Sequence, residues 1–307
     1  RIAPSCSAAP HHAQARAAAG GNQFHRLTQF NTQGAISGVR FDNRGFSNTI
    51  VGVTSPYGTY IDKVVSLAQP GNLLFLSPGG IRMGGDAGFV QINQLGLSTA
   101  TSLGFSGGGQ FNVFGTPASQ VLGLTGAPLW GANSLGVDAA ARSAAGISGV
   151  PGIEADGISI SVDRELLVDA VDGVARVNHS TFTVQPSLGK GGSLSILGNE
   201  VLIEGASKLL ATGPAGGGLL QLGGSWQNSN PQIRQALRTV FGRDALADAS
   251  ATQKGDGGTV VVWSDVSKPQ SLTTVAGALI AKAGPRSGDG GAIETSGARL
   301  DLRQPRI

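Results

Sequence analysis

The stretch Gly71–Ala100, GNLLFLSPGGIRMGGDAGFVQINQLGLSTA, contains three short apolar runs separated by two glycine corners. The first run, Leu73–Leu76, is followed by Ser77-Pro78-Gly79-Gly80, where proline fixes φ and glycine tolerates positive φ. Ile81–Met83 resumes the apolar pattern before a second glycine corner, and a third run begins at Phe89. Short strands and sharp corners at this spacing predict a chain that turns repeatedly on itself.

The last third of the chain repeats this arrangement. Gly205–Gly224, GASKLLATGPAGGGLLQLGG, aligns with Gly277–Gly297, GALIAKAGPRSGDGGAIETSG. Each contains a strand-like run, a Gly-Pro corner, a glycine cluster and a second strand-like run. Related clusters at Gly191-Gly192 and Gly257-Gly258 precede the apolar runs SLSIL and TVVVW. A unit of this kind cannot bury its apolar face alone, so the repetition predicts stacked neighbours in a solenoid.

Composition supports many short strands joined by tight corners. The chain has 307 residues, of which 49 are glycine, 40% are hydrophobic and 13% are charged. The glycines follow no collagen period, and the apolar fraction is sufficient for a core, so the low charge does not indicate disorder. The sequence has no run of about 18 apolar residues and therefore predicts no membrane-spanning helix.

Charge and cysteine content exclude several functional classes. The formal net charge is only +3 and the basic residues are scattered, whereas a nucleic-acid interface requires Lys and Arg gathered on one face. We therefore expect no nucleic-acid partner. The single cysteine, Cys6, excludes an internal disulfide framework. In an exported chain, this scarcity of cysteine would avoid disulfide formation in the periplasm.

Two stretches carry the motifs of one protein family. Gly20, Gly21, Asn22, Phe24, His25 and Phe30 match the pattern G-G-N-L-F-H-S-F-x-x-F. Asn72, Leu73, Ile81, Gly84 and Ser98-Thr99-Ala100 match N-L-x-L-x-N-P-N-G-I-x-F-G and its small-residue ending. The sequence thus resembles the haemagglutination-activity domain of filamentous-haemagglutinin-like exoproteins, the passengers of bacterial two-partner secretion. Ser77 and Gly79 replace the asparagines that flank the proline in the family motif.

The resemblance extends over most of the chain, roughly from Gly20 to Leu302. The later matches, to the repeat that follows the secretion domain in this family, are Gly255–Gly258, Trp263, Asp265, Ala281, Gly284, Glu294 and Ser296-Gly297. It implies a secretion domain over residues 21–190 and continuing β-helix repeats over residues 191–307. Residues 1–20 are expected to be disordered and to be either the remnant of a signal peptide, with Ala13-Gln14-Ala15 as its cleavage site, or an unstructured leader; the first alternative is favoured.

The family function is export without chemistry. In this family an outer-membrane β-barrel transporter recognises the unfolded domain through periplasmic POTRA domains, and the chain folds after crossing the barrel. The resemblance therefore implies a secreted or surface-exposed protein. The residues that carry the family motif, and that we expect to matter for transporter recognition, are Asn22, Phe24, His25, Phe30, Asn72, Leu73, Ser77, Pro78, Gly79, Gly80, Ile81 and Gly84. We expect backbone shape at Pro78–Gly80 to matter more than the missing amides.

Two further functions are considered beside export. An adhesive or surface-structural protein that binds glycans or proteins of a host or neighbouring cell is compatible with secretion. A β-helix polysaccharide-active enzyme would need several carboxylates on one groove. Acidic residues do occur between Glu154 and Asp172, but they alternate with apolar strand positions, which is typical of a solvated face. His25 lacks a nucleophile or carboxylate at a recognisable spacing, so a structural histidine is favoured and no catalytic residue is expected.

No metal or cofactor site is predicted either. Cys6, His11 and His12 match no closed zinc site. The GDGG pieces are similar to calcium-binding nonapeptides, which need tandem nine-residue spacing. Asp256 and Asp289, however, lie 33 residues apart.

We therefore predict an all-β fold, a right-handed parallel β-helix that forms a single-stranded solenoid, with small extra-helical β elements. Roughly 20–25 residues per coil, with about three strands per turn, would allow about twelve coils. The resemblance implies that Thr101–Gly152 leaves the stack as a β-rich excursion, in which Trp130 either covers an apolar edge or is exposed. Pro231–Phe241 predicts a short helix after a Ser229-Asn230 cap.

Overall fold

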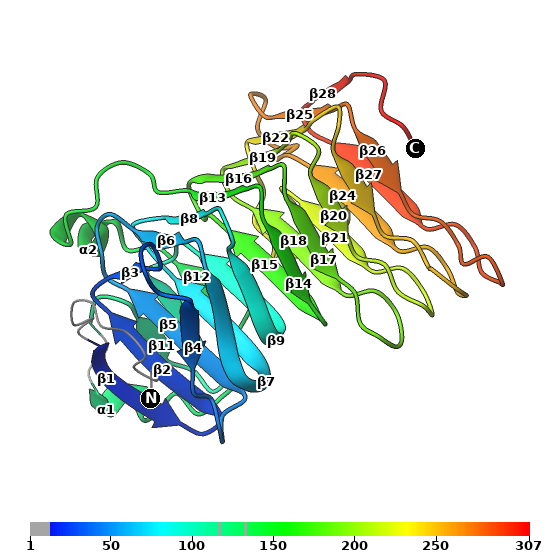
Figure 1. Ribbon diagram of the computed structural model, residues 1–307. Coiled ribbons are helices and arrows are strands. Elements are labelled where there is room, and N and C mark those ends of the chain that lie inside the picture. Colours follow the sequence, from blue (N-terminus) through cyan, green and yellow to red (C-terminus); the bar gives the residue numbers. More distant parts are fainter. Residues whose placement is uncertain (1–12, 116–117, 132–133) are drawn as a thin grey trace.

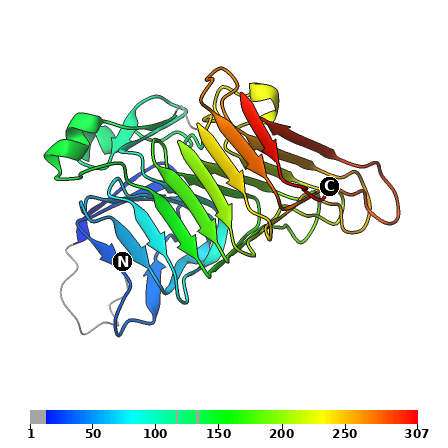
Figure 2. The ribbon, with the colours of Figure 1, turned by 90° about the horizontal axis from the view of Figure 1, so that it is seen from above.

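The computed structural model describes residues 13–115, 118–131 and 134–307 and shows a parallel β-helix (Figure 1). Each turn of the chain adds one strand to each of two or three sheets that run along the axis. Seen from above, the coils follow one another in chain order from the amino-terminal to the carboxy-terminal end (Figure 2). The all-β, parallel β-helical fold predicted from the sequence is confirmed.

The first sheet extends along the whole axis. Its strands, in spatial order, are β1 (Ala13–Ala19), β2 (Asn22–Leu27), β5 (Asn48–Val53), β7 (Val64–Leu76), β9 (Gly88–Ser98), β15 (Glu165–Asp169), β18 (Ser193–Leu197), β21 (Leu219–Leu222), β24 (Thr259–Trp263) and β27 (Ala292–Ser296). β4 (Gly38–Phe41) pairs with the first half of β7. Only β1 is antiparallel to its neighbour, so it ends the sheet as a hairpin with β2 and covers its edge.

Two further sheets complete the coils. The second sheet contains β3 (Phe30–Asn31), β6 (Thr59–Ile61), β8 (Ile81–Met83), β13 (Ile153–Asp156), β16 (Val174–Asn178), β19 (Glu200–Glu204), β22 (Arg238–Phe241), β25 (Leu272–Val275) and β28 (Arg299–Leu302). The third sheet contains β14 (Ser159–Val162), β17 (Thr181–Val184), β20 (Lys208–Leu210), β23 (Leu246–Asp248) and β26 (Ala278–Ile280). All pairs in both sheets are parallel.

In-register columns of apolar side chains fill the interior. One column on the first sheet consists of Val51, Phe75, Leu97, Val168, Ile196, Leu222 and Val262. The third sheet contributes Ile160, Phe182, Leu209, Ala247 and Leu279. All these residues belong to one continuous buried cluster. Because a shift by one residue would turn each strand's apolar set outward, this core fixes the register between coils.

Glycine permits close stacking where the chain enters the first sheet. The amides of Leu219, Thr259 and Ala292 each donate to a glycine carbonyl one coil earlier, at 2.9 Å. A Cβ on Gly218, Gly258 or Gly291 would overlap that same carbonyl oxygen. The glycine clusters are therefore required by the approach of one backbone to the next, in addition to their use at corners.

Four loops project beyond these glycines and lie against one another; we call residues 184–192, 211–218, 249–258 and 281–291 together the flange. In three of them a hydrogen bond of 2.7 Å closes the neck, from the glycine amide to the carbonyl of Ala211, Ala249 or Ala281. The flange is visible as the stack of narrow loops at the lower right of Figure 1.

The described residues between 101 and 152 form the excursion, which leaves the stack between β9 and β13. It contains a small antiparallel sheet of β10 (Ser102–Gly104), β11 (Gln110–Asn112) and β12 (Leu135–Gly136), with the helices α1 (Ala118–Val121) and α2 (Ala139–Ala144). The excursion packs on the outer face of the first sheet and makes a second apolar cluster with it. Trp130 covers Gly96 and Leu74 there, so the covering alternative for this residue is confirmed.

The structure agrees with the predicted repeats but not with the predicted number of coils. Gly205–Gly224 and Gly277–Gly297 do occupy equivalent positions, each as a third-sheet strand, a flange loop and a first-sheet strand. The estimate of about twelve coils was wrong, because the first sheet has nine parallel strands in its path, β2 to β27. Across the excursion, the register partners Gln94 and Glu165 are 71 residues apart. Elsewhere, register partners in adjacent coils lie from 21 residues apart, at Gly71 and Ile92, to 40 apart, at Leu219 and Thr259.

Two local predictions are corrected. The helix expected over Pro231–Phe241 is absent: one 3-10 turn forms at Trp226–Asn228, and Arg238–Phe241 is strand β22. Asn230 Oδ1 accepts from the amide of Gln232 in a local turn, and strand pairing overrides the helical periodicity. The leader was expected to be disordered throughout, but Ala13–Ala19 forms β1. Whether cleavage follows Ala15 stays a prediction.

The close backbone contacts predict that alanine at Gly258 lowers the stability of the fold much more than alanine at Gly290 does. Gly258→Ala should lower the free energy of unfolding by about 3 kcal/mol, because its Cβ has no space beside the carbonyl of Gly218. Gly290→Ala is the control, since nothing lies within 4 Å of the added atom. Urea unfolding followed by circular dichroism measures both. Equal stability of the two variants would contradict the close backbone approach.

Candidate functional site

Two motif asparagines, Asn22 and Asn72, form a row of amides with Asn48 across successive coils. Asn22, Asn48 and Asn72 are in register on β2, β5 and β7. Asn48 Nδ2 donates to Asn22 Oδ1 at 2.7 Å, and Asn72 Nδ2 donates to Asn48 Oδ1 at 2.8 Å. At the amino-terminal end, Asn22 Nδ2 donates to the carbonyls of Leu124 and Gly126 in the excursion at 2.8 and 2.7 Å. The row therefore connects three coils to the excursion.

The same register continues with longer side chains. Gln94 follows Asn72 in β9, and its Nε2 donates to Glu165 Oε2 at 2.9 Å. Burial raises the pKa of Glu165, while the hydrogen bond from Gln94 opposes that rise. Asn72 Oδ1 is buried without a hydrogen-bond partner. The hydrogen bonds between members of this row specify register more strictly than apolar contacts do.

Two proline corners of the same sequence type lie one above the other. Ser55-Pro56-Tyr57-Gly58 and Ser77-Pro78-Gly79-Gly80 each close with a hydrogen bond from the final glycine amide to the serine carbonyl, at 3.1 and 2.9 Å. Gly58 and Gly80 have φ of 75° and 104°. A Cβ on Gly79 would overlap the carbonyl oxygen of Ser55 and the amide of Gly58, so the stacked corners require glycine at this position.

The hydroxyl of Ser77 makes local bonds within this corner. It donates to the carbonyl of Gly80 at 2.8 Å and accepts from Thr59 Oγ1 at 3.0 Å, and Ser77 is fully buried. The serine thus links its own turn to the residue that follows the turn below. The corner is held by this hydroxyl, a buried Pro78 and two glycines, without a side-chain amide.

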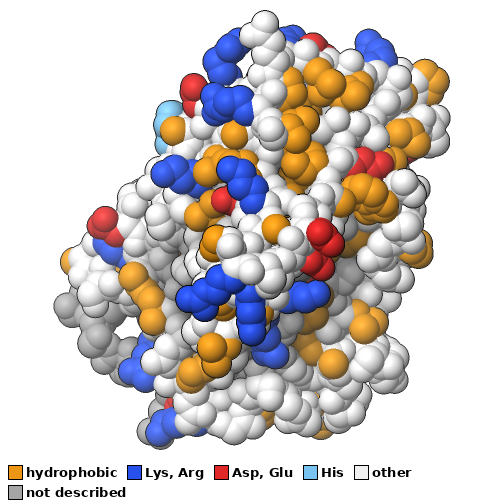
Figure 3. All heavy atoms as spheres, turned by 90° about the vertical axis from the view of Figure 1, so that its right-hand side faces the viewer, with side chains coloured by type: hydrophobic (Ala, Val, Ile, Leu, Met, Phe, Trp, Pro, Cys, Tyr) orange, Lys and Arg blue, Asp and Glu red, His pale blue; other side chains and the backbone are white. Residues whose placement is uncertain are grey.

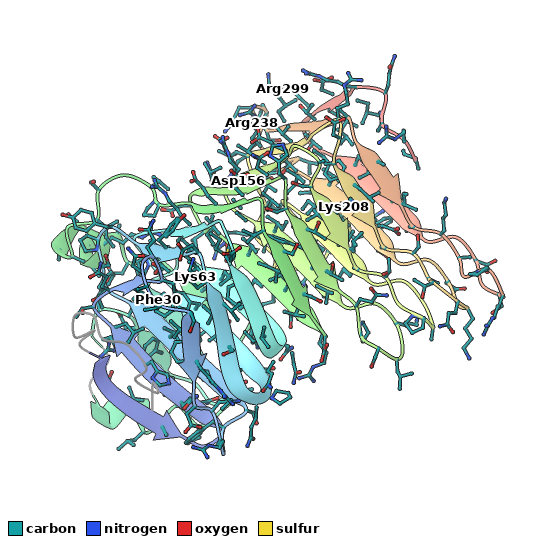
Figure 4. All side chains as sticks on the ribbon, in the orientation of Figure 1. Phe30, Lys63, Asp156, Lys208, Arg238 and Arg299 are labelled. Carbon is teal, nitrogen blue, oxygen red and sulfur yellow. The ribbon has the colours of Figure 1, made fainter. Side chains whose placement is uncertain are left out.

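Phe24, His25 and Phe30 have different environments. Phe24 points away from the axis and packs on Phe105 and Phe111 of the excursion, with ring centroids 5.7 and 5.4 Å away. His25 is in register with Val51 at the head of an interior column and is buried near the ring of Phe41. Phe30, labelled in Figure 4, contacts Phe75 edge-on at 5.0 Å. None of the three faces an open cleft, and all contribute to packing.

The structure therefore places ten of the twelve motif residues in three regions, while Asn72 belongs to the amide row on β7 and Gly84 lies apart. Asn22 and Phe24 lie under the excursion, His25, Phe30, Leu73 and Ile81 lie in the core, and Ser77–Gly80 forms the corner. Gly84 lies after β8, where an added Cβ would come no closer than 3.6 Å to the Tyr60 hydroxyl. These residues build the first coils and do not converge on one chemical site. Their role in transporter recognition stays a prediction.

Three arginines hold the excursion to the coils. Arg26 of β2 donates to the carbonyls of Val113 and Asn112 at 2.8 and 2.9 Å. Arg142 of α2 pairs with Asp172 at 2.9 Å and donates to the carbonyl of Thr99 at 2.9 Å. Arg234 pairs with Asp169 at 3.1 Å and donates to the carbonyl of Leu135 at 2.8 Å. The sequence analysis missed these arginines, although Arg142 is the one charged residue in the alanine-rich segment 139–145.

Asp169 is the most deeply buried member of these pairs. Its side chain is 0% exposed, whereas that of Arg234 is 25% exposed. Burial raises the pKa of Asp169, and the Arg234 guanidinium and the Val171 amide oppose that rise. Removing the arginine would leave a carboxylate without its counter-charge in the second apolar cluster, the situation in which a lost ion pair is most destabilising.

The acidic residues considered for enzymatic chemistry are spread over different faces. Glu154 and Asp156 lie on the second sheet, where they contact Arg82 and Asn178, and Asp156 is visible there in Figure 4. Glu165 and Asp169 are the first and last residues of β15 in the first sheet, and Asp172 lies in the turn that follows. These five carboxylates lie on different faces of the coils, whereas the enzyme alternative needs several of them on one groove.

Neither metal ligands nor a membrane helix are found in the described part of the chain. Within these residues, no group of three or more His, Cys, Asp or Glu side chains is arranged to hold a metal ion. Cys6, His11 and His12 lie outside the described residues. Asp256 Oδ1 accepts from the amide of Asp289 at 2.9 Å. No described helix has the length and apolar character needed to cross a membrane.

Comparisons with known proteins show a likeness in structure but none in sequence. No family model matches the sequence, and no curated protein matches it. Among solved structures, the chain is similar to the HMW1 secretion domain from Haemophilus influenzae, with 16% identity, coverage of 96% of this chain and 95% of that chain, and a TM-score of 0.37. The fold assignment rests on the strand pairing and register described above.

The buried ion pair predicts that removing Arg234 lowers the stability much more than removing Arg238 does. Arg234→Ala should lower the free energy of unfolding by about 3–5 kcal/mol, because Asp169 is left buried and unpaired. Arg238→Ala should cost about 1 kcal/mol or less, since its pair with Glu200 is half exposed. Chemical unfolding of both variants measures the difference. Similar stabilities would show that Arg234 does not hold the excursion.

Proposed function

We propose that this chain is the secretion domain of a two-partner secretion exoprotein, exported through a partner outer-membrane β-barrel that binds it through POTRA domains. The observation that carries the proposal is the placement of the family motifs. The two stretches that match the haemagglutination-activity domain form the first coils. These coils contain both the stacked proline corners and the amide row. The motif residues thus specify the part of the solenoid on which later coils stack.

The architecture supports export of an unfolded chain followed by folding outside. Each coil after β9 adds its strands beside those of the previous coil, and β1 covers the amino-terminal edge of the first sheet. Folding can therefore propagate from the amino-terminal coils as the chain emerges. Each completed coil buries apolar side chains and pairs its backbone, which opposes movement back through the barrel. Before folding, exposed strands could pair with a sheet edge of the transporter's periplasmic domains.

The proposed location is the bacterial surface or the surrounding medium. On that surface the β-helix would act as an adhesin or a structural element, with glycans or proteins of other cells as partners. The dispersed carboxylates favour this binding role over polysaccharide cleavage. The proposal requires no cofactor.

Export with and without the partner transporter tests the proposal. With its native leader and the transporter, the chain should accumulate in the medium or on the surface, and without the transporter it should stay in the periplasm. Gly79→Ala should reduce the exported folded protein about tenfold, because its Cβ prevents the two proline corners from stacking. Gly88→Ala, outside the family motif, is the matched control and should be exported normally, since its added Cβ makes only an ordinary contact with Val64.

A second measurement separates recognition from folding. The urea-unfolded chain should bind the isolated POTRA domains, and Gly79→Ala should bind equally well because the corner is not formed in that state. Secretion that is independent of the transporter, or absence of POTRA binding by the unfolded chain, would contradict the proposed route.

A further inference from the structure

The flange carries a row of exposed cations along the axis of the solenoid. Lys190, Lys254, Lys282 and Arg286 all lie in its loops and are exposed. Figure 3 faces this end of the molecule and shows Lys and Arg side chains gathered at the level of the loop tips. Among the described residues, none of the four lies within ion-pair distance of a carboxylate. These charges are therefore available to a partner.

Backbone hydrogen bonds between adjacent loops fix the positions of these cations along the axis. The amide of Lys254 donates to the carbonyl of Pro214 at 3.1 Å, and the amide of Arg286 donates to the carbonyl of Gln253 at 3.0 Å. The aliphatic stem of Lys190 lies against Gly216, in the loop that has no cation of its own. Successive loops are about 4.8 Å apart, as expected for paired strands. The cations thus follow the axis in steps of one or two coils.

The two carboxylates of the flange do not cancel this row. Asp256 Oδ1 accepts from the amide of Asp289 at 2.9 Å, so this carboxylate is directed to the neighbouring loop backbone. Asp289 is exposed, as are the four cations, which leaves the flange net positive. Other surface arginines differ in this respect: Arg82, Arg176 and Arg238 of the second sheet pair with Glu154, Glu204 and Glu200 at 3.7, 3.4 and 3.4 Å.

We propose that the flange binds a linear anionic polysaccharide that runs parallel to the solenoid axis across the loop tips. The step between cations is comparable with the length of a sugar unit in an extended chain. Sulfate or carboxylate groups would receive charge-assisted hydrogen bonds from the lysines and a bidentate pair from Arg286. The exposed side chains of Thr252, Gln253 and Ser287 lie beside these cations and can bind sugar hydroxyls.

Other polyanions fit the flange less well. The four loops contain no aromatic residue on which a base could stack, which disfavours single-stranded nucleic acid. A lipid surface would be bound more strongly by several inserted apolar side chains. Leu188 is the large apolar side chain that these loops expose, at 84%. The observations therefore favour a sugar polymer, and this inference does not depend on the route of export.

Binding to dextran sulfate, with uncharged dextran as the comparison, tests the inference. The folded chain should bind the sulfated polymer at low salt and ignore the uncharged one. The triple variant Lys190→Ala, Lys254→Ala, Arg286→Ala should weaken binding about tenfold and reduce the dependence of log K on log salt by about 2 to 3. All three residues are exposed, so circular dichroism and the melting temperature should not change.

A matched variant controls for net charge. This control is the triple variant Arg82→Ala, Arg176→Ala, Arg238→Ala, which removes three positive charges from the second sheet. It should change the affinity by less than about twofold, because these arginines are already paired with glutamates. Equal losses in the two triple variants, or no binding of dextran sulfate, would overturn the proposal. Flange-dependent binding to phosphatidylglycerol vesicles without binding to dextran sulfate would assign the surface to lipid and overturn it as well.

Discussion

Backbone hydrogen bonding between successive coils is the interaction on which the rest of this structure depends. It brings main chains so close at the corners that glycine is required at Gly79, Gly218 and Gly258, where any Cβ would overlap the coil below. It also aligns side chains into columns, so that one register decides both the apolar interior and the outer row of amides. A high glycine content and a low charge content are consequences of the same stacking.

The excursion covers part of the outer face of the first sheet. The outer face of the first sheet is apolar at Phe24, Ile50 and Leu74, and residues from the excursion bury it. Arginine pairs then fix the position of the covering segment, and the deepest of them joins Asp169 to Arg234. Both faces of these strands are therefore buried, which explains why Leu73–Leu76 is continuously apolar and does not alternate.

Local sequence patterns predicted the strands and corners of the coils better than they predicted the contacts of the excursion or the arrangement of the surface charges. Gly71–Ala100 identified β7, β8 and β9 because proline, glycine and apolar alternation are local signals. The helix predicted over Pro231–Phe241 failed because Val240 pairs with Leu202 and Thr274, which are distant in sequence. Nothing in their spacing connects Arg234 to Asp169, 65 residues away, so the contacts that place the excursion required the fold. The unpaired state of the flange cations likewise depends on the fold, since the sequence shows only scattered charges.

Cross-linking of outward-facing residues in adjacent coils tests the stacked register most directly. Ser161 and Thr183 are partners in β14 and β17, and neighbouring strands about 4.8 Å apart allow a disulfide. In a variant without Cys6, the pair Ser161→Cys and Thr183→Cys should form an intramolecular disulfide rapidly on mild oxidation. The pair Ser161→Cys and Thr181→Cys, displaced by two residues, should remain largely reduced. Equal oxidation of both pairs, or failure of the in-register pair to close, would contradict the parallel in-register stacking from which the fold, the corners and the flange all follow.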